Sequence, residues 1–105
     1  MMRIMILAAA TWDYAGHLCG TRMTTAQYRR DLRRDGIDLE GFDADHGLPR
    51  SLGGADHPLN YEMIDSSLNR SLGNDLMRKL FAHPAHLLRG AAVSALMRLR
   101  CSPQL

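Results

Sequence analysis

The chain has 105 residues, of which 46% are hydrophobic, and a formal net charge of +2. A chain of this length can bury one hydrophobic core without disulfides or structural metal ions, but it is too short for separate catalytic and substrate-binding domains. We therefore expect a single domain over residues 1–105 with a small, self-contained site.

Charge is distributed unevenly along the chain. No acidic residue follows Asp75, so the last thirty residues hold five basic side chains and carry a charge of +5. The acidic residues lie mainly in the middle of the chain. This division favours a polyanionic partner at the basic end and a divalent cation near the centre.

The two cysteines, Cys19 and Cys101, are far apart, and neither belongs to a CxxC pair. Their spacing indicates neither a zinc knuckle nor a disulfide framework, so we expect a reducing, intracellular and cytoplasmic location. The apolar run at residues 4–10 is too short to span a membrane and at the short end for a secretory signal. We expect it to form a buried strand or helix, with a targeting role as the alternative.

A helix is expected from Thr24 or Thr25 to Gly36, because threonine favours a helix start and glycine a helix end. Its arginines are spaced three and four apart and so share one face. They are Arg29, Arg30, Arg33 and Arg34. Such a ridge can lie along a phosphate backbone. The alternative is a solvated face on which Asp31 and Asp35 pair with the arginines.

The next forty residues predict a strand, a loop, a second strand and a helix. Residues 37–46 alternate loosely and predict an irregular strand. Residues 47–58 contain two prolines and three glycines and predict a loop, and residues 61–64 predict a short second strand. Asp65 or Ser66 caps the following helix, which Pro84 ends. Its apolar stripe is Leu68, Leu72, Leu76 and Leu80.

A last helix is expected over about residues 85–100. The side chains predicted to face inward are Leu88, Ala92, Ala95 and Leu99. Two strands followed by helices, with helices on both flanks, place the chain in the α+β class.

Residues 43–74 carry the candidate catalytic pattern. Asp45 and His46 are adjacent, Asn60 follows His46 by fourteen residues, and Asn69 follows it by twenty-three. A neutral imidazole can take a proton from water near pH 7, so His46 can serve as a general base. Asp45 and Asn69 offer hard oxygen ligands that suit Mg²⁺ or Mn²⁺. Asn69 lies in the first turn of its helix, where a phosphate is favoured, and Arg70 beside it could steady that group.

This segment resembles the HNH nuclease family, also called the ββα-metal fold. The matching features are the acid–His pair, the proline three residues after His46, the SLGG turn, Asn60, and Asn69 followed by Arg70. The resemblance implies a metal-dependent endonuclease acting on DNA, or on RNA, with a ββα-metal core at about residues 37–82. Segments 1–36 and 83–105 would flank this core as helices.

The resemblance also implies a role for each site residue. Asp45 and Asn69 would bind Mg²⁺ or Mn²⁺, and His46 would be the general base. Asn60 would brace the loop by hydrogen bonds to the backbone near His46. The residues expected to contact nucleic acid are Arg29, Arg30, Arg33, Arg34, Arg50, Arg70, Arg78 and Lys79.

Some positions depart from the family pattern. Gly47 stands where a β-branched apolar residue is usual, Gly73 stands where some members have a second helix ligand, and the stapling cysteine pairs are missing. The alternative function is therefore a catalytically inactive nucleic-acid-binding module on the same core.

Two further residues lie near the candidate site. Asp43 could hold the site residues in place without contacting the substrate. His57 is expected to be exposed in its loop. No membrane partner is expected, and the oligomeric state stays open.

Overall fold

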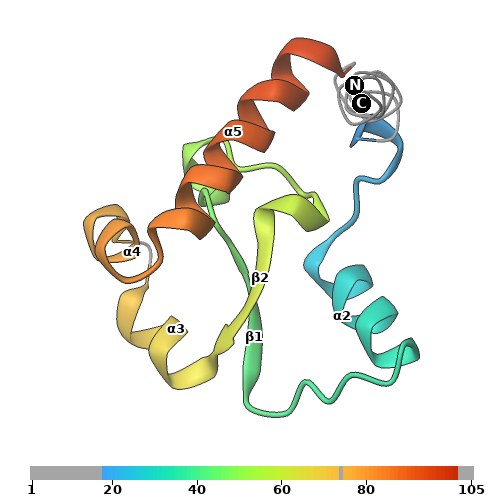
Figure 1. Cartoon of the computed structure of the whole chain (residues 1–105), viewed down its shortest axis with the longest axis vertical. Coiled ribbons are helices and arrows are strands. Elements are labelled where there is room, and N and C mark those ends of the chain that lie inside the picture. The colour runs from blue at the N-terminus through green and yellow to red at the C-terminus, as the bar shows by residue number, and fades with distance from the viewer. Residues whose placement is uncertain (1–17, 74, 102–105) are drawn as a thin grey trace, which may run out of the picture.

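The computed structural model describes residues 18–73 and 75–101. An antiparallel ribbon of β1 (Phe42–His46) and β2 (Tyr61–Asp65) is combined with helices, which confirms the predicted α+β class. The helices are α2 (Thr25–Arg34), α3 (Ser66–Leu72), α4 (Leu76–Ala82) and α5 (Pro84–Arg100), and the loop between the strands holds the 3-10 turns η1 (Arg50–Leu52) and η2 (Pro58–Asn60). Helix α2 lies on one side of the ribbon and helices α3 and α4 lie on the other (Figure 1). The element predicted at residues 4–10 lies outside the described residues.

Helix α2 begins and ends close to the predicted residues. The Thr24 hydroxyl accepts a hydrogen bond from the Gln27 backbone N–H at 3.2 Å, and the Gln27 side chain accepts one from the Thr24 N–H at 2.9 Å. This reciprocal capping box satisfies two N–H groups that a helix start otherwise leaves unpaired. Gly36, at a φ of +86°, follows the helix end and takes a backbone conformation that favours glycine.

The strand pairing decides which face each candidate residue occupies. His46 stands opposite Tyr61, while Asp43 and Asp45 stand opposite Ile64 and Glu62. The His46 and Tyr61 ring centroids lie 4.8 Å apart, and a tyrosine of α2 packs 5.3 Å from Tyr61 on the same face. Because side chains alternate along a strand, Asp43 and Asp45 point to the opposite face, toward α3, α4 and α5. The acid–His pair is thus divided between the two faces of the ribbon.

The single helix predicted between Asp65 and Pro84 is wrong, because the structure has two helices there. Helix α3 ends at Leu72, followed by Gly73 at a φ of +56°. Asp75 then starts α4, and its carboxylate accepts hydrogen bonds from two backbone N–H groups of the new first turn. A helix-ending glycine followed by a strong capping residue outweighs the leucine spacing.

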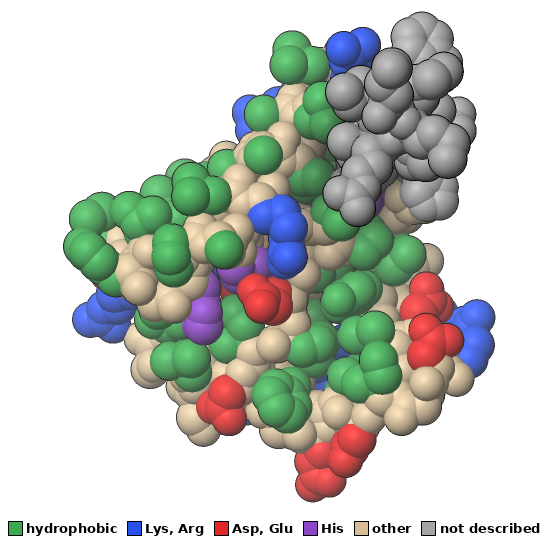
Figure 2. Space-filling model, in the orientation of Figure 1, with side chains coloured by type: hydrophobic (Ala, Val, Ile, Leu, Met, Phe, Trp, Pro, Cys, Tyr) green, Lys and Arg blue, Asp and Glu red, His purple; other side chains and the backbone are tan. Residues whose placement is uncertain are grey.

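The predicted inward face of α5 is also wrong. The buried residues of this helix are His86, Leu87, Gly90, Val93, Ser94 and Met97. Leu88 and Leu99 are 61% and 81% exposed instead, and hydrophobic side chains follow the outer surfaces of α4 and α5 (Figure 2). Since α5 is largely apolar all round, the period of its sequence does not select one face. The small residues Gly90 and Ser94 face inward because the loop between the strands approaches them closely.

The two cysteines form a disulfide, which their spacing in the sequence does not indicate. Cys19 and Cys101 are separated by 82 residues, with their Cα atoms 5.5 Å apart. The bond ties the segment before α2 to the end of α5, next to a core of Leu18, Val93 and Met97. The expectation of a reducing compartment thereby loses its support. Within residues 18–73 and 75–101, no helix is long and apolar enough to cross a membrane.

Candidate functional site

Asn60 holds the loop between the strands in place. It is fully buried, and its amide oxygen accepts a hydrogen bond from the Leu48 N–H at 2.9 Å. Its amide nitrogen donates to the backbone oxygens of Leu48 at 3.2 Å and Ala55 at 2.9 Å. The loop is therefore tied to the start of β2 at two points, one of them two residues after His46. The hydrogen bonds expected for Asn60 are present.

The structure explains why position 47 is a glycine, where the family pattern has a β-branched residue. A Cβ atom placed on Gly47 would collide with the backbone oxygen of His86 in α5, and one placed on Gly90 would collide with the Asn60 side chain. Helix α5 thus packs directly on the Asn60-braced loop at two glycines, and neither position leaves room for a β-branched residue.

Asn60→Ala should lower the free energy of unfolding by about 1 to 3 kcal/mol, because the backbone groups it satisfies would be buried without partners. The measurement is urea denaturation followed by circular dichroism. The matched control is Asn69→Ala, which replaces a partly exposed asparagine and should cost clearly less. Equal stability of the Asn60 variant and the wild type would contradict the bracing role.

His46 is paired with an acid that the sequence did not point to. Its Nε2 lies 2.9 Å from Oδ1 of Asp56, and its side chain is 17% exposed. A carboxylate at this distance accepts the Nε2 hydrogen, which fixes the tautomer and leaves Nδ1 as the proton acceptor. The described residues place no hydrogen-bond partner on Nδ1. The Arg50 guanidinium lies 3.7 Å from the same Asp56 oxygen, which puts a cation beside the pair.

Asp56 is itself held in place. Its backbone oxygen accepts a hydrogen bond from the Met23 N–H at 3.1 Å. The Tyr61 hydroxyl donates to the Met23 oxygen at 2.7 Å and lies 3.3 Å from the Asp56 carboxylate. Burial raises the pKa of Tyr61, and the Asp56 charge raises it further, so this hydroxyl stays protonated and acts as a donor. The segment before α2 therefore helps to orient the acid that orients His46.

Asp45 lies on the other face, in a buried charge network. The Lys79 ammonium donates to both of its carboxylate oxygens at 3.1 Å, and His86 Nε2 lies 3.1 Å from one of them. Burial raises the pKa of Asp45, but the His86 hydrogen bond and the Lys79 charge lower it by more, so it lies below its ordinary value. Asp45 is thus ionised and already bound to a cation.

Asn69 contacts Asp43 rather than Asp45. Its amide nitrogen donates to Asp43 at 3.1 Å, and the Ser66 hydroxyl donates to the other Asp43 oxygen at 2.8 Å. These two hydrogen bonds lower the pKa of Asp43. Asp43 stands three residues before His46, which is about 10 Å along a strand and on the opposite face.

The predicted metal ligands do not fit a metal ion in this arrangement. A carboxylate and an amide oxygen have the right chemistry for Mg²⁺. However, the Lys79 ammonium is hydrogen-bonded to both carboxylate oxygens of Asp45, and Asn69 is hydrogen-bonded to Asp43 instead. No cluster of three or more His, Cys, Asp or Glu residues that could hold a metal ion is found in the described parts of the chain.

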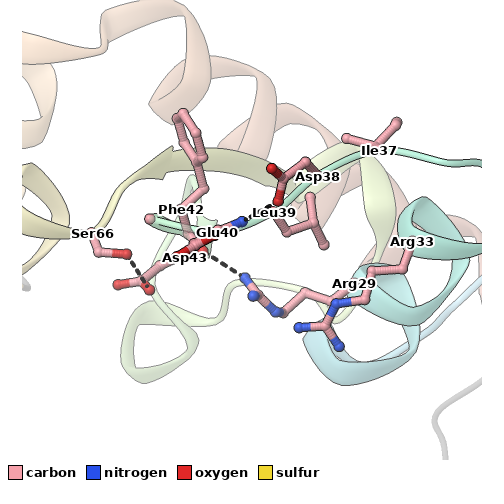
Figure 3. A pocket seen from close by; sticks show the side chains of 10 residues that line it. Arg29, Arg33, Ile37, Asp38, Leu39, Glu40, Phe42, Asp43 and Ser66 are labelled. Carbon is pink, nitrogen blue, oxygen red and sulfur yellow. Dashed lines mark hydrogen bonds between the residues drawn. The ribbon is translucent and has the colours of Figure 1, made fainter.

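The predicted arginine ridge is mostly on the surface. Arg30, Arg33 and Arg34 are exposed, and Arg34 pairs with Asp31 at 3.3 Å, as the solvated-face alternative expected. Arg29 donates to the Phe42 oxygen at 2.7 Å. Arg29 and Arg33 lie at the edge of an open hollow of about 550 Å³ that also contains Asp43 and Ser66 (Figure 3). The hollow lies between α2, β1 and the start of α3.

Among the other residues expected to contact nucleic acid, Arg50, Arg70 and Arg78 are exposed, although Arg78 also donates to the Ser71 oxygen at 3.0 Å. Lys79 is an exception, because it is 4% exposed with its ammonium on Asp45, so it does not lie on the surface. A lysine is buried in this way only when its charge is paired.

The prediction that His57 is exposed is also wrong. It is 2% exposed, its Nδ1 accepts a hydrogen bond from the Leu59 N–H, and its Nε2 lies 2.9 Å from the Thr21 hydroxyl. Asp56, Lys79 and His86 were missed as partners of the predicted site. Lys79 and His86 lie outside residues 43–74, and Asp56 lies within the loop of that segment without a characteristic spacing to His46, so no spacing in the sequence signals these contacts.

The comparisons with known proteins give no family assignment. No protein-family model matches the chain, and neither a curated protein nor a solved structure matches it.

Proposed function

We propose that this chain is an endonuclease that hydrolyses phosphodiester bonds in DNA, with a ββα-metal core and His46 as its general base. The observation that carries the proposal is the hydrogen bond between His46 Nε2 and Asp56, which presents Nδ1 as the proton acceptor. The Asn60-braced loop supports it, because this loop carries Asp56 and connects the two strands. The resemblance of residues 43–74 to HNH nucleases supplies the reaction type.

In this proposal, water loses a proton to His46 Nδ1 and attacks the phosphorus, and the bond from phosphorus to the leaving oxygen breaks. Asp56 stabilises the imidazolium that forms and keeps the ring in place. Arg50, beside this pair, is available to contact the phosphate. Arg29 and Arg33 would bind neighbouring phosphates of the same strand.

A requirement for Mg²⁺ or Mn²⁺ is part of the proposal on the strength of the resemblance. Such an ion would neutralise charge on the phosphate when bound. No reaction step is assigned to it, because the predicted ligands are not assembled. Because the Cys19–Cys101 disulfide removes the argument from unpaired cysteines, an intracellular, cytoplasmic location is part of the proposal only through DNA as the substrate.

The test uses the purified full chain and short fluorescent duplexes of DNA and of RNA, with Mg²⁺, Mn²⁺ or EDTA. The proposal expects shortened DNA strands on a denaturing gel with either metal and intact strands with EDTA. Cleavage of the RNA duplex alone would change the substrate class. Binding of the duplexes without cleavage under every condition would favour the inactive binding module.

Replacing Arg29, Arg30, Arg33 and Arg34 with alanine should reduce the salt dependence of DNA binding. Each phosphate contact contributes about 0.9 to the slope of log K against log salt concentration, so losing two or more contacts should flatten it by roughly 2 or more. Fluorescence anisotropy across a salt series measures this slope. The charge-conserving variant with four lysines should keep the wild-type slope. An unchanged slope in the alanine variant would show that the ridge is only a solvated face.

A further inference from the structure

Helix α5 has a buried face and, opposite to it, an exposed apolar face. The buried face, which includes Leu87, Val93 and Met97, packs against the rest of the domain. The exposed face carries apolar side chains at intervals of four, three and four residues. They are Leu88, Ala92, Ala95 and Leu99, and we call them the outer seam. Its two leucines are 61% and 81% exposed, on the outer surface of α5 (Figure 2).

The spacing of the outer seam is typical of a surface that packs against another helix. Apolar residues that alternate between intervals of three and four form one narrow stripe, which is the contact line of paired helices. At 1.5 Å per residue, the stripe from Leu88 to Leu99 is about 16 Å long. The alanines at its centre let a second helix approach closely, and the leucines at its ends supply the larger apolar surface.

The outer seam has the same residues and intervals when it is read in either direction. If two copies of α5 lie antiparallel, with a two-fold axis between Ala92 and Ala95, each Leu88 lies beside Leu99 of the second copy. Each Ala92 then lies beside Ala95 of the second copy. A two-fold homodimer requires a self-complementary patch of this kind. A second copy of this chain therefore fits the seam along its whole length.

The charged side chains within this span are turned away from the seam. Between Leu88 and Leu99 they are Arg89 and Arg98, which the helical period places on the flanks of the seam. Arg89 donates to the backbone oxygens of Leu59 at 2.9 Å and Tyr61 at 3.2 Å. The Arg98 guanidinium lies next to Gly53 in the loop between the strands. Both cations are thus directed toward their own domain, which leaves an uncharged contact line.

We propose that the outer seam of α5 is the contact surface of an antiparallel homodimer. A typical stable interface buries about 800 Å² per partner, and one pair of helices with a contact line of about 16 Å buries less. The association should therefore be weak, with a dissociation constant in the micromolar range. The seam points away from the ribbon that carries His46, so the dimer leaves that residue open. The inference goes beyond the proposed function and does not depend on it.

The test is sedimentation velocity of the purified full chain over a series of protein concentrations. The wild type should shift from the monomer mass toward twice that mass as the concentration rises. Ala92→Glu should weaken the association by about tenfold or more, because it places two like charges close together on an apolar contact line. The matched control is Ile37→Glu, which changes a 48% exposed residue after α2 and should associate as the wild type does.

A mixture of two variants tests the antiparallel register. Ala92→Glu and Ala95→Lys should each self-associate more weakly than the wild type. Their equimolar mixture should associate more tightly than either variant alone, because position 92 of one copy lies beside position 95 of the other. No gain in the mixture would overturn the antiparallel pairing.

A wild type that stays monomeric at every concentration would overturn the inference, as would a dimer that Ala92→Glu does not weaken. Both substituted positions are exposed on a helix, so circular dichroism should show the helix content of the wild type. If Ala92→Glu does not fold, Ala95→Glu replaces it with the same expected loss of association. DNA is absent from these measurements, so a failure of the dimer leaves the proposed function intact, and a failure of cleavage leaves the dimer intact.

Discussion

His46→Ala should lower the rate of DNA cleavage by about 10²-fold or more, because a general base contributes that much to the chemical step. DNA affinity should change little, since the phosphate contacts come from arginines on other elements. Single-turnover cleavage on a gel measures the rate, and fluorescence anisotropy measures the affinity. A loss of rate without a loss of affinity is the signature of an interaction made in the transition state.

Two further variants show whether the loss of cleavage rate in His46→Ala comes from the loss of the general base. His83→Ala removes another histidine, whose Nε2 is buried without a hydrogen-bond partner in the described structure, and it should cleave DNA as the wild type does. Asp56→Ala should cost less than His46→Ala, because it removes the group that orients the ring and leaves the base itself. Near-normal cleavage by His46→Ala would refute the assignment of the base.

Asp45→Ala should destabilise the protein by about 3 to 5 kcal/mol, because it leaves the buried Lys79 ammonium without its counter-charge. Urea denaturation measures the loss. Asp45→Ala combined with Lys79→Met should be more stable than Asp45→Ala alone, since no unpaired charge stays buried. Asp31→Ala removes one partner of an exposed pair and should cost roughly 1 kcal/mol or less. A small loss of unfolding free energy in Asp45→Ala would mean that the Lys79 ammonium is hydrated in that variant and that the charge network is not buried in solution.

The stabilisation by Asp45 should also depend on pH. Its pKa in the folded protein is lowered from 3.8, so the folded state favours the ionised carboxylate. The contribution should be fully present above the unfolded value and lost as pH falls through the lowered value. The stability difference between the wild type and Asp45→Asn should therefore shrink on acidification below about pH 3.8. A difference that is constant across that range would contradict the ion pair.

Features set by neighbouring residues could be predicted from the sequence. The Thr24 cap and the start of α3 at Asp65 follow from side chains that bond to their own backbone. Both strands were expected, but the first is shorter than the predicted residues 37–46, because β1 begins only at Phe42. The hydrogen bonds of Asn60 to the loop backbone were also expected, from the resemblance and because one amide can donate and accept at once.

Features that depend on distant partners could not be predicted. Asp43 and Asp45 share one face of β1, so strand periodicity could not choose which of them contacts Asn69. Lys79 is buried by a carboxylate 34 residues earlier in the chain. The disulfide joins residues 82 apart without any recognisable spacing. Local propensity carries no information on such contacts, because they form only when the elements pack.

The same limit applies to helix ends and helix faces. Leucines at intervals of four predict one long helix, but the chain leaves the helical conformation at Gly73 and forms the two helices α3 and α4. In α5, apolar residues surround the helix, so the inward face was decided by the loop that packs on Gly90. Steric fit to a neighbour, rather than hydrophobicity, selected the buried side.

The most direct test of the proposed function is the nicking of closed circular plasmid DNA by the purified full chain. With Mg²⁺ or Mn²⁺, the wild type should convert supercoiled circles to relaxed or linear forms, while His46→Ala and the wild type in EDTA should leave them supercoiled. Closed circles offer no strand ends, so conversion requires an endonuclease. If the wild type binds the plasmid but leaves every circle intact in Mg²⁺ and in Mn²⁺, the chain is not a nuclease and the inactive nucleic-acid-binding module takes its place.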